Sequence, residues 1–230
     1  MLKNVLHPVI SFILVVASAG ASAASVPDVL PAALAWTGKS ERLIVPAGER
    51  WSTPAEKAEF RASPSYADTL AYLRELDDAS GMISLHTFGK SYQGRDLVYV
   101  HARKPGSGKP VVVVQAGIHA GEIDGKDAGL MLLRDIAVRG RDDLLDKVDL
   151  VYIPILNVDA HENASALGRP HQRGPHMKGS RTSAQGLDLN RDYARLQSPE
   201  IAAVVKLLQR FDPALYVDLH VSDGIDYQYD

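Results

Sequence analysis

The chain has 230 residues, of which 46% are hydrophobic, and a formal net charge of -3 at pH 7. This length suits one sizeable domain, and the weak charge, without basic clusters among aromatic residues, argues against a nucleic-acid partner. The sequence contains no cysteine, which excludes a disulfide framework.

The N-terminus has the pattern of a signal peptide, which we predict over residues 1–23. Lys3 supplies the positive charge, residues 9–19 are apolar, and small residues follow at 21–23. The apolar run is too short to cross a bilayer comfortably, so we expect no stable membrane insertion after removal of the signal. The predicted location is therefore periplasmic or secreted.

Two further segments follow the signal peptide. Residues 24–62 are rich in Pro, Ala, Ser and Gly and predict an extended leader, whereas residues 63–230 carry the periodic patterns of a domain. In chain order these patterns predict a helix capped at Ser63 and ended by Gly81, strands at 82–88, 97–102 and 111–116, a helix at 126–138, a strand at 148–155, a helix opening at 198, and a strand at 214–220. Strands alternating with helices predict an α/β fold.

Metal-ligand side chains follow two of the predicted strands. His119 and Glu122 come directly after the strand at 111–116, and their spacing of three places both side chains on one side of a turn or helix start. His220 ends the last predicted strand, and neighbouring strands would bring these ends together. Imidazole and carboxylate are ordinary zinc ligands, and a catalytic zinc site needs three protein ligands plus an open position.

A dense polar segment at 179–192 contains Arg181 and the stretch Asp188-Leu-Asn-Arg191. Taken with His-x-x-Glu at 119–122 and the later His220, it strongly resembles the M14 family of zinc metallocarboxypeptidases. The resemblance implies an α/β fold with a mixed sheet flanked by helices, one zinc ion, and the C-termini of peptides or proteins as substrate. The family's sheet has more strands than this sequence predicts, so it also implies that C-terminal strands are missing.

The resemblance assigns roles to individual residues. The family's three zinc ligands match His119, Glu122 and His220. Asp188 matches the carboxylate that orients a ligand histidine, and Asn190 and Arg191 match the pair that holds a terminal carboxylate. Arg181 matches the arginine that stabilises the oxyanion during catalysis. The family's general-base glutamate and lid tyrosine would fall after residue 230.

Other interpretations remain open at this stage. N-acyl amino acid amidohydrolases of the desuccinylase and aspartoacylase kind share the same order of motifs, although a signal peptide is unusual for them. A zinc-binding remnant without catalytic activity also fits, because no base is present. Asp218 shares its side of the strand with His220, but the sequence gives it no defined role.

Overall fold

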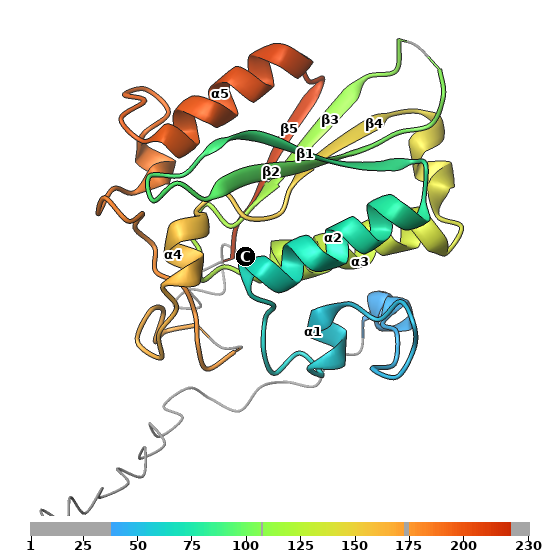
Figure 1. Ribbon diagram of the computed structural model, residues 1–230, viewed down its shortest axis with the longest axis horizontal. Helices are drawn as coiled ribbons and strands as arrows, with labels where there is room; N and C mark the ends of the chain where they lie inside the picture. Colours follow the sequence, from blue (N-terminus) through green and yellow to red (C-terminus); the bar gives the residue numbers. More distant parts are fainter. Residues whose placement is uncertain (1–37, 107, 173–174, 222–230) are drawn as a thin grey trace, which may run out of the picture. The chain divides into compact units, whose positions relative to one another are not determined.

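A five-stranded mixed sheet forms the centre of the described part of the chain (Figure 1). The computed structural model describes residues 38–106, 108–172 and 175–221, so the predicted signal peptide lies outside the described residues. In the order β1-β2-β4-β3-β5, the strands are β1 (Ile83–Lys90), β2 (Asp96–Ala102), β4 (Asp149–Ile153), β3 (Val111–Ala116) and β5 (Leu215–Leu219). The first three pair antiparallel and the last three parallel, which confirms the predicted α/β class with a mixed sheet.

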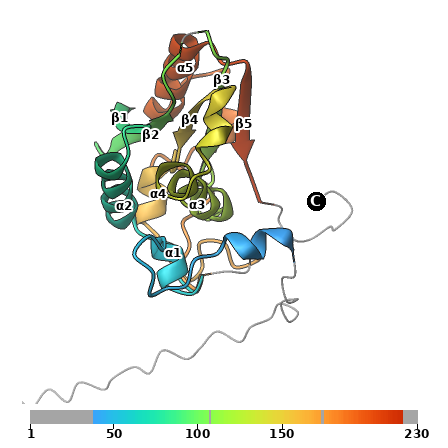
Figure 2. The same cartoon turned by 90° about the vertical axis from the view of Figure 1, so that its right-hand side faces the viewer.

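Helices cover both faces of this sheet (Figure 2). Helices α2 (Tyr66–Ala79) and α3 (Asp124–Val138) pack against one face through buried leucines such as Leu73 and Leu133. Helix α5 (Pro199–Phe211) covers the other face through Ile201 and related apolar residues. Strand β3 lies between these layers and is paired on both edges, which accounts for the four consecutive valines with which it begins.

Several short elements lie outside the periodic patterns. They are η1 (Lys39–Leu43), α1 (Pro54–Lys57), η2 (Asp142–Asp146), α4 (Val158–Glu162) and η3 (Leu189–Arg191). The first two lie within the segment 24–62, and α1 begins with a capping box between Thr53 and Glu56. The last two lie in the long non-periodic stretch between β4 and α5, which is thus only partly irregular.

The pairing of β3 with β5 brings two distant parts of the chain together. The two strands are parallel and in register, with Ala116 opposite Leu219. Their carboxyl ends therefore open at the same edge of the sheet, where ligand sites gather in α/β proteins. Among the described residues, none of the helices combines the length and apolar character needed to cross a bilayer.

Candidate metal centre

A tight turn at the end of β3 positions the first two candidate ligands. Gly117 has a φ of +68°, a backbone conformation that residues other than glycine rarely adopt. A Cβ at this position would also lie 3.4 Å from the backbone of Ile155. The backbone N–H of Glu122 then donates to the carbonyl of His119 at 3.0 Å. This turn directs the imidazole and the carboxylate to the same side.

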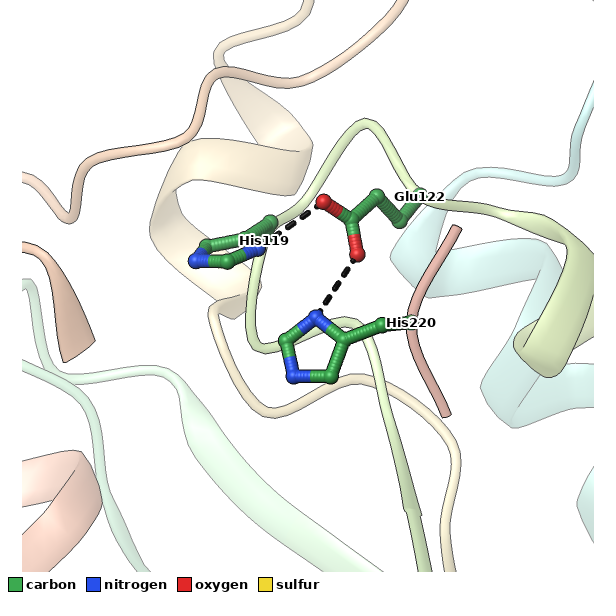
Figure 3. A group of neighbouring side chains, drawn as sticks. All are labelled: His119, Glu122 and His220. Carbon is green, nitrogen blue, oxygen red and sulfur yellow. Dashed lines mark hydrogen bonds and ion pairs between the residues drawn. The ribbon is translucent and has the colours of Figure 1, made fainter. Parts of the chain in front are cut away.

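Three side chains converge where β3 and β5 end (Figure 3). Nδ1 of His119 lies 2.8 Å from Oε1 of Glu122, and Nδ1 of His220 lies 3.0 Å from Oε2 of the same carboxylate. One ligand atom from each of the three residues lies within 4.8 Å of the others. The structure thus brings together the three predicted metal ligands, two of them close in sequence and the third at the end of another strand.

The donor set of this cluster suits zinc. Two imidazole nitrogens and one carboxylate are the ligand types of catalytic zinc sites, which leave a further position open. His119 and Glu122 are buried, whereas the side chain of His220 is 35% exposed, so the cluster is reached from the side of His220. These residues therefore fit a divalent ion that is protected on one side and accessible on the other.

Glu122 is held as an anion. Its burial acts to raise its pKa, but the hydrogen bonds from His119 and from the backbone N–H of Val221, together with the charges of His119 and Arg169, outweigh this and lower the pKa to about 2. A deprotonated carboxylate is the form that binds metal, so the site needs no proton loss from Glu122 near neutral pH.

Asp188 lies behind the first imidazole. Its Oδ1 is 3.2 Å from Nε2 of His119 and accepts the backbone N–H of Asn190 at 3.0 Å, while Oδ2 accepts from Nε of Arg181 at 3.0 Å. Desolvation acts to raise the pKa of Asp188, but these hydrogen bonds and the charge of Arg181 lower it overall. An ionised carboxylate at Nε2 leaves Nδ1 of His119 as the nitrogen that faces the cluster.

The three remaining predicted residues differ in how directly they contact the cluster. The side chain of Arg181 is 40% exposed and pairs with Asp188, while Nδ2 of Asn190 lies 3.4 Å from Nε2 of His220. Arg191 is exposed, and its Nη1 donates to the carbonyl of Asn190 at 2.9 Å. Arg181 and Asn190 are thus linked to the cluster through Asp188 and His220, whereas Arg191 is linked to it only through Asn190.

The sequence patterns did not identify Arg169, which lies in the loop between α4 and η3 and contacts Glu122 of the cluster. This residue is 2% exposed, and its Nη2 donates to Oε1 of Glu122 at 2.9 Å. Its approach depends on Gly121, where a Cβ would lie 2.4 Å from Cγ of Arg169 and 2.5 Å from the carbonyl oxygen of Gly179. The glycine in His-Ala-Gly-Glu is the only sequence signal for this contact, and it does not specify the partner.

The packing at Gly121 predicts a measurable cost for a methyl group. We expect Gly121→Ala to lower the free energy of unfolding by about 1–3 kcal/mol, because one of the two close contacts is with backbone and cannot move cheaply. Gly81→Ala is the control, since a Cβ at Gly81 meets nothing within 4 Å. Urea unfolding of both variants measures the difference, and equal stabilities would contradict this account of Gly121.

Comparison with known proteins agrees with this geometry. The family model for the zinc carboxypeptidases, peptidase family M14, matches residues 69–230. The chain belongs to the M14 zinc carboxypeptidase family, as its motifs predicted. This family implies zinc as the metal, and the His119, Glu122 and His220 cluster is present in the part of the chain that the structure describes.

Individual relatives extend the same likeness. The chain is 26% identical over 170 residues to carboxypeptidase 2 of Trichophyton rubrum, which covers 69% of this chain and 29% of that protein. It is 30% identical over 118 residues to carboxypeptidase B of Bos taurus, covering 49% and 28% respectively. The chain therefore spans less than a third of the length of either relative.

Solved structures share the fold. A metallo-carboxypeptidase from Burkholderia cenocepacia superimposes with a TM-score of 0.60 at 22% identity, covering 72% of this chain and 43% of that one. A metallo-carboxypeptidase from Pseudomonas aeruginosa, in complex with (2-guanidinoethylmercapto)succinic acid, gives a TM-score of 0.55 at 25% identity, covering 71% and 41%. The mixed sheet with its flanking helices is thus the arrangement of zinc carboxypeptidases.

Proposed function

We propose that this chain is the zinc-binding part of an exported metallocarboxypeptidase, with a signal peptide at 1–23, a leader at 24–62 and the catalytic domain from residue 63. The observation that carries the proposal is the convergence of His119, Glu122 and His220, with both Nδ1 atoms directed at one carboxylate. These three residues would hold one zinc ion. When bound, zinc supplies Lewis-acid chemistry and activates water at neutral pH.

The surrounding residues support hydrolysis at a peptide C-terminus. Arg191 has a planar guanidinium that can meet a carboxylate with two parallel hydrogen bonds, and the amide of Asn190 adds a further donor. Together they would recognise the free terminal carboxylate and so restrict cleavage to the last peptide bond. Arg181 would stabilise negative charge on the scissile carbonyl oxygen, where a preorganised donor has a large effect on rate. Asp188 would keep His119 oriented.

A binding comparison tests this substrate class. The purified chain, loaded with zinc, is titrated with a short peptide that has a free C-terminus and with the same peptide amidated. The proposal predicts zinc at one ion per chain and tighter binding of the free acid. Release of the C-terminal residue is measured on the same samples, alongside hydrolysis of N-acyl amino acids. Preference for N-acyl amino acids would replace the proposal with an amidohydrolase, and zinc uptake without peptide preference or turnover would leave a zinc-binding remnant.

Arg191 provides a sharper prediction. We expect Arg191→Ala to weaken binding of the free-acid peptide by about 10- to 100-fold, which corresponds to losing a hydrogen-bonded charge pair worth about 1.5–3 kcal/mol. Zinc uptake should not change, because Arg191 does not contact the three ligands and bonds only its neighbour's carbonyl among the described contacts. Calorimetric titration gives both affinities. Arg195→Ala, an exposed arginine nearby, is the control and should bind like the parent.

A further inference from the structure

A second carboxylate lies behind the second imidazole of the cluster. Asp218 lies on β5 two residues before His220, on the same side of the strand. Its Oδ2 is 3.1 Å from Nε2 of His220. We propose that Asp218 is the positioning residue for His220, an inference that rests on the zinc site proposed above.

The argument begins with the tautomer of His220. Nδ1 faces Oε2 of Glu122 at 3.0 Å, so a metal ion held by this cluster would be bound through Nδ1. A neutral imidazole that binds through Nδ1 carries its proton on Nε2, and that proton needs an acceptor. Oδ2 of Asp218 is such an acceptor, whereas the nearer atom of Asn190, Nδ2 at 3.4 Å, is a donor as placed. Asp218 therefore favours the metal-binding tautomer.

The environment of Asp218 supports a role at the site. Its side chain is 19% exposed, and its other oxygen, Oδ1, is buried without a hydrogen-bond partner among the described residues. Burying a carboxylate with one oxygen unsatisfied costs free energy, and no described cation pairs with Asp218 to offset it. The contact with His220 is thus the interaction that this carboxylate makes, rather than a structural ion pair of the sheet.

The position of Asp218 in β5 holds its carboxylate near His220. Asp218 pairs with Gln115 of β3 in the parallel ladder, which continues to Leu219 and so fixes the backbone up to the residue before His220. Asp188 stands in the same relation to Nε2 of His119, at 3.2 Å. Each imidazole of the cluster therefore has a carboxylate at the nitrogen that points away from Glu122, an arrangement that raises ligand basicity and fixes ring orientation.

Zinc affinity of the full chain tests the proposal, measured by competition with a chelator. We expect Asp218→Ala to weaken zinc binding by about 10- to 100-fold, and Asp218→Asn to weaken it less, because the amide oxygen still accepts a hydrogen bond. In the zinc-loaded parent, a slowly exchanging imidazole N–H proton of His220 should be visible by NMR and should be lost in Asp218→Ala. A purely structural role would lower stability without changing either readout.

The controls separate this inference from the zinc site itself. Tyr216→Phe removes a hydroxyl on the same strand, paired with Tyr193 at 2.7 Å, and should leave zinc affinity unchanged. If the parent binds zinc and both Asp218 variants bind it within twofold of the parent, the role of Asp218 is overturned and the site survives. If Asp218→Ala does not fold, the isosteric Asp218→Asn decides. A parent that binds no zinc would overturn both inferences.

Discussion

Replacement of His119 by alanine should reduce bound zinc from one ion per chain to none at micromolar metal. His119 supplies a buried nitrogen donor 2.8 Å from Glu122, and without it the cluster retains one exposed imidazole and one carboxylate. Two ligands are too few for a catalytic zinc site. Equilibrium dialysis followed by metal analysis measures the loss, and His220→Ala should behave in the same way.

His86→Ala is the matched control for this prediction. His86 is exposed on β1, where it contacts Ser84 and stacks on Tyr99, and it takes no part in the cluster. This variant should bind zinc like the parent. Because a ligand that binds only the folded state stabilises it, saturation at 100 times Kd should add about 2.7 kcal/mol to the unfolding free energy of the parent and nothing to that of His119→Ala. Full zinc uptake by His119→Ala would overturn the ligand assignment.

Replacement of Arg134 by methionine should lower the free energy of unfolding by about 3–5 kcal/mol. Arg134 is fully buried on α3, where Nη1 donates to Oε2 of Glu56 at 2.6 Å and Nε donates to Oδ1 of Asp135 at 2.8 Å. Its Nη2 also donates to the carbonyl of Leu43. Methionine fills much of the volume but leaves the buried charge of Glu56 uncompensated, and it removes the link between α3 and the segment preceding α2.

Arg139 offers the control, because it reaches two of the same partners, Asp135 and the Leu43 carbonyl, from a more exposed position. Its side chain is 39% exposed, and its contacts with Asp135 and the Leu43 carbonyl are 3.3 and 3.4 Å. Arg139→Met should cost less than about 1 kcal/mol. Urea unfolding gives both values, and a loss for Arg134→Met no larger than that for Arg139→Met would contradict the role given to the buried arginine.

Much of the fold could be predicted from the sequence because its main elements carry strong periodic patterns. The strand at 111–116 was predicted with its observed bounds, and α3 and α5 were found from their apolar faces. The short helices in 38–57 and α4 were missed, since helices of four or five residues present no periodicity. The sequence does contain one indication of α1, because Thr53 and Glu56 have the spacing of a capping box, but this motif is not part of a periodic pattern.

In the candidate site, too, the contacts set by a turn or by strand pairing could be predicted, whereas a contact set by loop packing could not. His119 and Glu122 lie three residues apart, so the turn after β3 is enough to bring their side chains together. The nearness of His220 to this pair results from the parallel pairing of β3 with β5. The contact of Arg169 with Glu122 spans 47 positions and depends on how an irregular loop packs against Gly121. The spacing of residues does not predict this contact, because the conformation of such a loop depends on its tertiary packing and not on a periodic pattern.

The most direct measurement is the anomalous diffraction of crystals of the full chain grown with zinc, recorded at the zinc absorption edge. We predict one strong peak about 2.0–2.2 Å from Nδ1 of His119, from Nδ1 of His220 and from the carboxylate of Glu122. Such a peak would place all three side chains, from two distant stretches of the chain, on one ion. A peak elsewhere, or coordination through Nε2 of either histidine, would contradict the account.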